Sequence, residues 1–525
     1  MEFNNMPAKI FSAAILNLDA QPIEVEVASS RGLRFFEIVG LPDKAVEESK
    51  ERVASAIRNS GFLSPLQSRL RILVNLAPAD LKKEGSFYDL AIALGFLLET
   101  KQIYFDSQGK IFIGELALDG RLRPVKGVLA ISLLAKQRGY KEIILPKENI
   151  FEANLACLGS QKEDTLKIIG VNNLEEAIKY LQGQKQVVLP PISWTDYIKE
   201  SEVSIDFSWI RGQEHAKRAL EIAAAGSHHL FMVGPPGGGK TILAKAIVSI
   251  LPKLSFEESL EVTKIYSIAG LLNPEKPLLN SRPFRAPHHT ASEVALIGGG
   301  NPPRPGEITL AHRGVLFLDE FPEFHRDVLE SLRQPIEQGE ITVLRARQIM
   351  QLPSRFMLLG ASNPCPCGFK DDPQHECRCF PSQVAKYQRK LSGPLIDRID
   401  IFIEVPQVKY EKLTGKEEGE ESVGVQKRVE KAREIQKQRF SKIIRAKKKI
   451  LTNSEMEIPE IKKFCELDSQ TENLLRKYVD SGRLSARGFH RVLKMARTIA
   501  DLDKSAKILF RHASEALGYR VKEDS

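Results

Sequence analysis

A glycine-rich segment near the middle of the chain carries the residue types that bind nucleotide phosphates. Residues 234–241 read GPPGGGKT, which fits the pattern GxxxxGK[ST]. The apolar run 230–233 precedes this segment, and an amphipathic stretch typical of a helix follows it. Glycines let successive backbone N–H groups face phosphates, and a helix start adds partial positive charge. The predicted phosphate-binding residues are Gly234, Pro235, Pro236, Gly237, Gly238, Gly239, Lys240 and Thr241.

Polar residues that end two later apolar runs can complete a hydrolytic site. Lys240 can reach the β- and γ-phosphates of ATP, and Thr241 can bind Mg²⁺. Asp319, in GVLFLDEF, would hold the same ion, and Glu320 would polarise the attacking water as a general base. Asn363 ends the run RFMLLGASN, where it can orient that water; an ordinary Asn-Pro turn is the alternative.

Arginines follow in positions suited to transition-state chemistry. Arg398, in SGPLIDRIDIFIEV, precedes a predicted strand, in a loop that can reach a neighbouring subunit and stabilise transition-state charge. The predicted helix after Leu484 carries Arg487, Arg491 and Arg497. One of these can sense the γ-phosphate, and exposed surface arginine is the alternative for at least one.

Four of the six cysteines lie within fifteen residues, in the pattern C-x-C-x9-C-x-C. They are Cys365, Cys367, Cys377 and Cys379. Four thiolates can close a tetrahedral zinc site, with His375 as a possible substitute ligand. Metal-free cysteines in an insertion are the alternative, and the spacing fits no standard iron–sulfur run.

The remaining metal-ligating residue types favour structural roles. Cys157 and Cys465 stand apart from other cysteines and are typical of small core residues. His288 and His289 are adjacent, and we expect them to pack or hydrogen-bond rather than bind metal.

The elements that must position these residues fall into blocks along the 525-residue chain. Residues 1–183 alternate strand-like and helix-like patterns, typical of an α+β domain. Residues 184–208 are predicted to be a linker. Residues 209–410 resume β/α alternation around the phosphate loop, with the cysteine insertion at 365–379. Residues 411–525 have mostly helical periodicity.

Composition and charge exclude several classes of protein. Hydrophobic residues make up 42% and charged residues 27%, an ordinary soluble globular balance. No apolar run approaches the roughly 18–20 residues that span a bilayer, and no signal peptide is evident, so we expect a cytoplasmic protein without membrane contact. The net charge is +9, and residues 437–449 hold seven basic residues and no acid. That segment can bind a phosphate backbone, although a solvated helix face is the alternative.

The motifs, in this order, resemble those of the YifB/ComM family of magnesium-chelatase-like AAA+ ATPases. The resemblance rests on RPFRAPHHTAS (282–292), LAHRGVLFLDE, LRQPIEQGEI, NPCPCG and SGPLIDRID, and it covers nearly the whole chain. It implies an α/β fold with a parallel-sheet P-loop core, a C-terminal helical lid, and a preceding α+β domain like that of Lon protease.

The resemblance also implies roles for individual residues. Gly234 to Thr241 match Walker A, Asp319 and Glu320 match Walker B, Asn363 matches sensor 1 and Arg398 the arginine finger. Arg487 is the first choice for sensor 2 and Arg491 the second. Ile210, Gly212 and Gln213 match the segment near adenine. ITVLRARQIMQLPSRF, from Ile341, matches a hairpin that projects towards a ring pore, with Arg345 and Arg347 near its tip as DNA contacts or surface charges.

The N-terminal block departs from the Lon pattern at the catalytic positions. Phe87 aligns with the nucleophilic serine and Leu129 with the dyad lysine, while Ser86 and Lys126 are displaced by one and three residues. A Ser–Lys dyad needs the amine within hydrogen-bond reach of the hydroxyl. We therefore expect residues 1–183 to be a non-catalytic binding or assembly domain.

Three functions follow from these observations. The first is a homo-oligomeric ring motor, expected to be a hexamer, that hydrolyses ATP with Mg²⁺ and migrates branched or single-stranded DNA during recombination or natural transformation. The second is a magnesium-chelatase-type ATPase that drives metal insertion or protein remodelling through partner subunits. The third, an ATP-dependent protease, is disfavoured by the missing dyad.

Overall fold

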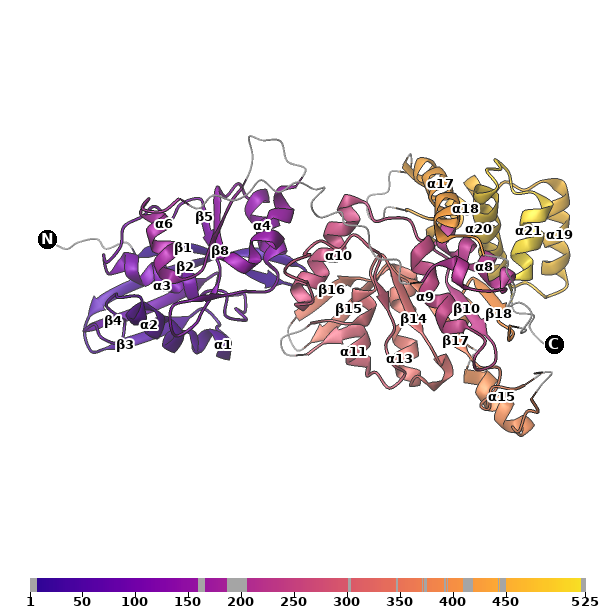
Figure 1. Cartoon of the computed structure of the whole chain (residues 1–525), viewed down its shortest axis with the longest axis horizontal. Helices are drawn as coiled ribbons and strands as arrows, with labels where there is room; N and C mark the ends of the chain where they lie inside the picture. The colour runs from indigo at the N-terminus through magenta and orange to yellow at the C-terminus, as the bar shows by residue number, and fades with distance from the viewer. Residues whose placement is uncertain are drawn as a thin grey trace. The chain divides into compact units, whose positions relative to one another are not determined.

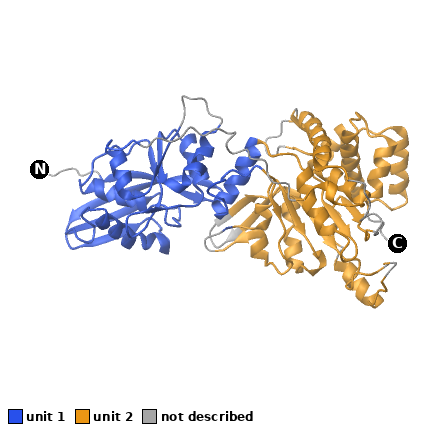
Figure 2. Ribbon diagram, viewed as in Figure 1, with its two compact units in different colours: residues 1–200, 256–280, 301–304 blue, residues 201–255, 281–300, 305–525 orange. Residues whose placement is uncertain are grey.

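The chain folds into two compact units, coloured separately in Figure 2. Unit 1 comprises residues 1–200, 256–280 and 301–304, and unit 2 comprises residues 201–255, 281–300 and 305–525. The computed structural model describes residues 7–158, 166–186, 205–300, 304–345, 348–370, 372, 375–390, 393, 395–408, 419–441, 443 and 450–520. Of the expected linker, 184–208, residues 187–204 lie outside the described residues.

Unit 1 has the α+β fold that its alternating patterns predict. Its main sheet has the order β1-β2-β4-β3, with β3 parallel to β4 and the other pairs antiparallel. These strands are β1 (Ala8–Leu16), β2 (Asp19–Arg31), β3 (Phe35–Val39) and β4 (Leu70–Ala77). A second, parallel sheet has the order β5-β8-β9, formed by β5 (Lys110–Phe112), β8 (Glu142–Pro146) and β9 (Lys167–Val171).

Apolar helices fill unit 1 around these sheets (Figure 1). α3 (Asp89–Glu99) is buried along most of its length, which explains why its sequence is apolar on every face. It packs on β1, β2 and α2 (Ser49–Asn59). The expected strand–turn–strand around Asp119 is the hairpin β6 (Glu115–Leu116) and β7 (Leu122–Arg123), which precedes α4 (Val128–Gln137).

One helix from the middle of the chain belongs to unit 1. α10 (Phe256–Ala269) follows the phosphate-loop helix in sequence but packs on α4. Ser267 of α10 donates a hydrogen bond to the buried Glu152 carboxylate, and Leu278 joins Leu129 and Leu155 in a small core. The expected span 209–410 is therefore interrupted at 256–280 and 301–304, because the apolar side chains of 256–280 find buried neighbours in unit 1.

Unit 2 is built on a five-stranded parallel sheet of order β11-β14-β17-β10-β18. The strands are β11 (Phe284–Arg285), β14 (Val315–Leu318), β17 (Met357–Ser362), β10 (Leu230–Val233) and β18 (Ile401–Glu404). Three adjacent strands of this sheet end at expected site residues. The phosphate loop follows the carboxyl end of β10, Asp319 follows β14, and Asn363 follows β17. In an open parallel α/β sheet this edge is where ligands bind.

Helices and one hairpin surround the sheet of unit 2. They are α8 (Glu214–Gly226), α9 (Lys240–Ile250), α11 (Glu293–Ile297), α12 (Glu307–Leu310), α13 (Arg326–Ser331), α14 (Arg333–Gln338), α15 (Pro381–Lys390), and the hairpin β15 (Glu340–Arg345) and β16 (Gln348–Pro353). The hairpin is the one expected from Ile341, with antiparallel pairing throughout. Arg347 lies outside the described residues.

The C-terminal helices form a lid that shares one hydrophobic core with the sheet. The lid helices are α17 (Ser422–Ser441), α18 (Ile458–Phe464), α19 (Ser469–Asp480), α20 (Ala486–Leu502) and α21 (Phe510–Gly518). Val429 of α17 and Val492 of α20 belong to the same buried cluster as Met232 of β10 and Leu243 of α9. The described part of the chain contains no helix long and apolar enough to cross a bilayer.

Candidate nucleotide-binding and hydrolysis site

The backbone of the phosphate loop requires glycine at specific positions. Gly237 and Gly239 have positive φ values, +75° and +89°, which L side chains rarely adopt. A Cβ added to Gly234 would lie 2.1 Å from the carbonyl oxygen of Val405. The loop therefore packs against the end of β18, and α9 begins directly after it at Lys240.

Lys240 lies at the centre of the site and is 8% exposed. Its Nζ donates hydrogen bonds to the carbonyl oxygens of Gly234 (2.6 Å) and Pro235 (2.9 Å) and to Oδ1 of Asn363 (3.1 Å). Burial lowers the pKa of Lys240, and the negative charge of Asp319 acts in the opposite direction. Lys240 and Asn363 are thus brought together from positions 123 residues apart.

The two residues expected to hold Mg²⁺ are in direct contact. Thr241 Oγ1 donates a hydrogen bond to Asp319 Oδ2 at 2.8 Å. A hydroxyl and a carboxylate are the oxygen ligands that Mg²⁺ prefers. These residues, with the glycine loop beside them, fit a magnesium–nucleotide complex.

Glu320 has a constrained backbone and an exposed carboxylate. Its φ is +50°, a left-handed conformation, and its N–H donates to Asp319 Oδ1 at 2.9 Å. Its side chain is 58% exposed, and Oε2 lies 3.1 Å from Nδ1 of His289. The expectation that His289 hydrogen-bonds fits this contact, but its partner could not be foreseen, because the segment containing 289 and β14 meet only in the fold.

The residues expected near adenine connect the loop to its surroundings. Ile210 is 5% exposed and belongs to the core of unit 2. Gln213 precedes α8 in a left-handed conformation, and its Nε2 donates to the carbonyl oxygen of Pro406 at 2.6 Å. The same Nε2 lies 3.4 Å from the carbonyl oxygen of Gly238. Gln213 therefore links the phosphate loop to the segment after β18.

Arg398 is mostly buried in unit 2 and is held in place by its neighbours. Its guanidinium forms an ion pair with Glu337 of α14, and its side chain is 14% exposed. The carbonyl oxygen of Arg398 accepts a hydrogen bond from Arg491 Nη1 at 2.7 Å. The position of this expected arginine finger is thus tied to the lid.

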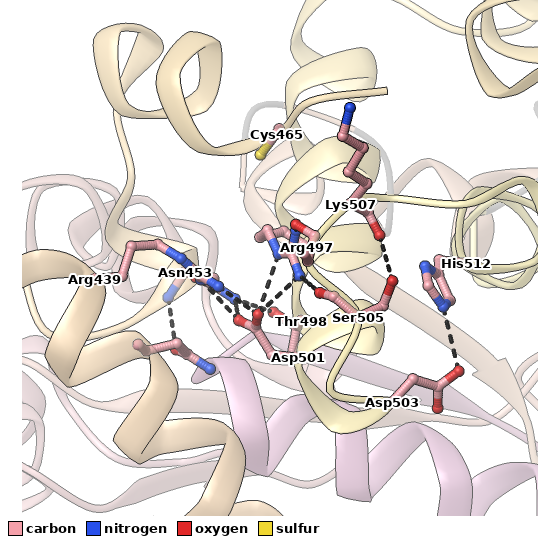
Figure 3. A network of polar contacts seen from close by, with 12 residues as sticks. Arg439, Asn453, Cys465, Arg497, Thr498, Asp501, Asp503, Ser505, Lys507 and His512 are labelled. Carbon is pink, nitrogen blue, oxygen red and sulfur yellow. Dashed lines mark hydrogen bonds and ion pairs between the residues drawn. The ribbon is translucent and has the colours of Figure 1, made fainter. Parts of the chain in front are cut away.

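The arginines of the lid helix α20 have different environments. Arg497 is 1% exposed and belongs to a buried polar network with Asp501, Asn453 and Arg439, drawn in Figure 3. Arg497 is therefore a structural residue of the lid. Arg487, near the start of α20, is exposed, so its expected role as sensor 2 stays a prediction.

Arg491 pairs with Asp400 in a cluster that sequence inspection did not identify. Its Nη1 donates to Asp400 Oδ1 at 2.7 Å, and His228 Nδ1 lies 3.3 Å from Asp400 Oδ2. Burial would raise the pKa of Asp400, but Arg491 and His228 outweigh it and hold that pKa well below its ordinary value. Burial lowers the pKa of His229 to about 4. The only signal in the sequence is the pair His228-His229 before β10.

The basic segment 437–449 is only partly described. Residues 437–441 lie in α17, whereas 442 and 444–449 lie outside the described residues. Within the described part, Arg439 is paired with Asp501, so this residue serves the lid fold. Arg439 is therefore neither a phosphate contact nor part of a solvated helix face, and the two expectations for the other six basic residues stay predictions.

The four clustered cysteines lie together after β17. Their Sγ atoms all lie within 4.8 Å of one another, and Cys365 is buried. The ring of His375 packs on Phe369, and its Nδ1 lies 3.4 Å from Asp372 Oδ1. The four cysteines, without His375, form the group with metal-ligand geometry among the described residues.

The Lon-like positions of unit 1 are occupied by packing residues. Leu129 is fully buried, and Phe87 packs against the core. The hydroxyl of Ser86 donates a hydrogen bond to the Glu115 carboxylate. Ser86, the serine next to the position of the protease nucleophile, is therefore hydrogen-bonded to a carboxylate.

The chain matches three families along its length. Residues 206–413 match "Magnesium chelatase, subunit ChlI", residues 25–149 match "Subunit ChlI of Mg-chelatase", and residues 419–520 match its C-terminal domain. The chain is 43% identical over 525 residues to Competence protein ComM of Haemophilus influenzae, covering 98% of this chain and 97% of that protein. The chain belongs to the YifB/ComM family of magnesium-chelatase-like AAA+ proteins.

One further relative supports the family assignment, and another supports the resemblance to Lon protease. The chain is 41% identical over 518 residues to YifB of Escherichia coli, covering 98% of this chain and 96% of that protein. It is also 27% identical over 198 residues to Lon protease 2 of Bacillus subtilis, covering 33% and 36% of the two chains. The expected fold, a P-loop core with a helical lid after a Lon-like α+β domain, is confirmed.

Proposed function

We propose that this chain hydrolyses ATP as a subunit of a ring motor that migrates single-stranded or branched DNA in recombination or competence. The hydrolytic part rests on one observation. Lys240, Thr241, Asp319, Glu320 and Asn363 converge at one edge of the parallel sheet. AAA+ relatives over the full length support the same assignment.

Each residue has a role that its contacts support. The backbone of the loop and Lys240 bind the phosphates, because the buried ammonium can exchange its carbonyl partners for phosphate oxygens. Thr241 and Asp319 would hold Mg²⁺, which neutralises charge on the β- and γ-phosphates. Glu320 takes a proton from the attacking water, with His289 orienting its carboxylate, and Asn363 positions that water.

Arg398 supplies the transition-state cation to the neighbouring subunit. This proposal makes hydrolysis depend on a ring, which we expect to be hexameric. It is supported by the contacts from Glu337 and Arg491 that fix the position of Arg398. An arginine delivered in trans is typically worth about 10³–10⁵ in rate.

DNA is the proposed substrate because the sequence contains a basic segment and the fold contains the hairpin that the family resemblance predicts. The net charge is +9, and residues 437–449 hold seven basic residues and no acid. The β15–β16 hairpin supports contact with a strand in a ring pore. The relative named as a competence protein supports the pathway. We propose that unit 1 is non-catalytic and serves binding or assembly.

The decisive experiment is a branch-migration assay with ATP and a non-hydrolysable analogue side by side. Migration with ATP alone is expected. ATPase activity should rise with forked DNA and not with casein. The Glu320→Gln variant should bind ATP and stop turnover, whereas the exposed Glu330→Gln control on α13 should behave as wild type. Full hydrolysis by Glu320→Gln would remove the proposed base.

A magnesium-chelatase-type motor is the second candidate, favoured by the family match at 206–413. Such a motor would hydrolyse ATP without stimulation by DNA and would act through partner subunits. ATPase activity that is unchanged by every DNA structure tested would favour this candidate over the first.

A further inference from the structure

The four cysteine sulfurs have the spacing of a metal centre. The Sγ of Cys365 lies 3.4 Å from that of Cys367 and 3.7 Å from that of Cys377, and the last two are 3.6 Å apart. A tetrahedral zinc ion with Zn–S bonds of about 2.3 Å separates its sulfurs by about 3.8 Å. A disulfide would bring two sulfurs to about 2.05 Å. The observed distances therefore fit zinc ligands and not bonded pairs.

The ligands come from two segments that flank a short insertion. Cys365 and Cys367 follow Asn363 at the end of β17, and Cys377 and Cys379 stand directly before α15. A central ion would close this insertion at both ends. In each pair, one residue separates two cysteines whose sulfurs must both point at the same ion, and the C-x-C spacing allows this.

The first cysteine pair lies against the nucleotide site. The N–H of Gly368 donates to the carbonyl oxygen of Cys365 at 2.9 Å, which forms a tight turn with a φ of +87° at Gly368. A Cβ added to Gly368 would lie 2.5 Å from Cδ of Pro236 and 3.8 Å from Cγ of Asn363. The turn therefore contacts the phosphate loop and the amide that bonds to Lys240.

The second pair reaches the same site through α15. Tyr387 of α15 is 7% exposed; burial raises the pKa of its hydroxyl to about 12, and the backbone of Asn363 acts in the opposite direction. Lys390, at the end of α15, donates to the carbonyl oxygen of Pro322 at 3.0 Å, two residues after the proposed base. Both ends of the insertion thus contact residues in or next to the proposed hydrolytic site.

We propose that Cys365, Cys367, Cys377 and Cys379 bind one structural zinc ion, and that this centre positions Asn363 and Pro236 for hydrolysis. The zinc site stands on the sulfur geometry alone. The positioning role rests on the proposed ATPase function. The cysteines are positioning residues, since they act through the turn at Gly368 and through α15.

Metal content tests the site independently of activity. Full-length protein purified without chelator should carry about one zinc per chain. Cys377→Ser and Cys379→Ser should lose it, while Cys157→Ser and Cys465→Ser, outside the cluster, should keep it. Wild-type protein with well under one zinc, or with iron and sulfide instead, overturns the proposal.

Two variants test positioning. Gly368→Ala should keep its zinc yet lower kcat about tenfold, because the new methyl displaces Pro236. In a double-mutant cycle, Cys379→Ser and Asn363→Ala should lower kcat together no more than the stronger change alone. Wild-type kcat in Gly368→Ala, or fully additive losses, overturns positioning. Zinc-loaded wild-type protein without any ATPase activity would instead refute the proposed function and leave the zinc site intact.

Discussion

The two units carry sequence patterns of known enzymes, but the residues at the expected catalytic positions are polar in unit 2 and apolar in unit 1. At the phosphate loop, every polar position of the pattern contacts another functional residue, as Lys240 does with Asn363 and Thr241 with Asp319. At the Lon-like positions of unit 1, Leu129 is fully buried and Phe87 packs on the core. A similar pattern does not by itself indicate the same chemistry, and the contrast agrees with our prediction that unit 1 is non-catalytic.

The contrast between the units predicts its largest effect at the phosphate loop. Lys240→Ala should abolish tight ATP binding and hydrolysis, because it removes the buried cation that faces the phosphates. Equilibrium binding of a labelled ATP analogue measures this effect. Lys245→Ala, an exposed change on the same helix, should bind as wild type. Tight ATP binding by Lys240→Ala would contradict the assignment of the phosphate-binding site to this loop of unit 2.

Substitution of Arg398 should have the next largest effect on hydrolysis. It tests whether the hydrolytic site of unit 2 needs an arginine from a neighbouring subunit. Arg398→Ala should retain nucleotide binding and lose about 10³–10⁵ in kcat. Rings mixed with Lys240→Ala subunits should recover part of the activity, because each mutant supplies what the other lacks. The absence of recovery at every mixing ratio would rule out action in trans.

Within unit 2, Arg497 should contribute to the stability of the fold and not to catalysis, as we expect of Leu129 and Phe87 in unit 1. Arg497→Ala should destabilise the lid by about 1–3 kcal/mol, because it removes one of the two arginines that pair with the buried Asp501. Arg487→Ala, at an exposed position, should change stability by no more than about 0.5 kcal/mol. Urea unfolding of both variants measures the difference. Equal stability losses would contradict the structural assignment of Arg497.

His229 should make unit 2 sensitive to acid. Its pKa is lowered to about 4, so the folded chain keeps it neutral while the unfolded chain takes up a proton below about pH 6.5. Its contribution to stability is present above pH 6.5 and is lost as the pH falls towards 4. His229→Gln should lose less stability over this window in urea unfolding. An unchanged pH profile in the variant would exclude His229 as the cause.

The smallest effect is expected in unit 1. Ser86→Ala and Lys126→Ala should each leave ATP hydrolysis and stability near wild type, and neither wild type nor variants should cleave casein. The measurement is a casein gel assay with ATP. Cleavage that disappears in Ser86→Ala would restore a protease to unit 1 and break the contrast.

The sequence predicted the elements that carry a strong local pattern. The phosphate loop needs glycines at fixed positions, and apolar strands that end in acid or amide were visible before any contact was known. The helical character of the C-terminal block also follows from periodicity, whereas the hairpin from Ile341 was expected from the family resemblance. Element type was recoverable because backbone conformation and burial act within a few residues.

Other features depended on partners far away in the chain. In the sequence, α10 lies within the predicted AAA+ core, but it packs in unit 1 because its apolar side chains are buried against α4 there. The contact of His289 with Glu320 and the pairing of Arg491 with Asp400 join segments with no common motif. For Arg497, sequence offered an exposed or a catalytic arginine, and the fold buried it.

By itself, the sequence determined which groups are available: a phosphate loop, an acidic pair after an apolar strand, an arginine at the expected finger position, and four clustered thiols. Only the tertiary structure decided which of these groups meet. It set Lys240 beside Asn363, gathered the four sulfurs, and placed the turn at Gly368 against Pro236. The physical reason is that reactivity requires contact within a few ångströms. Contact between distant segments is fixed by how strands align and cores fill, which no local pattern encodes.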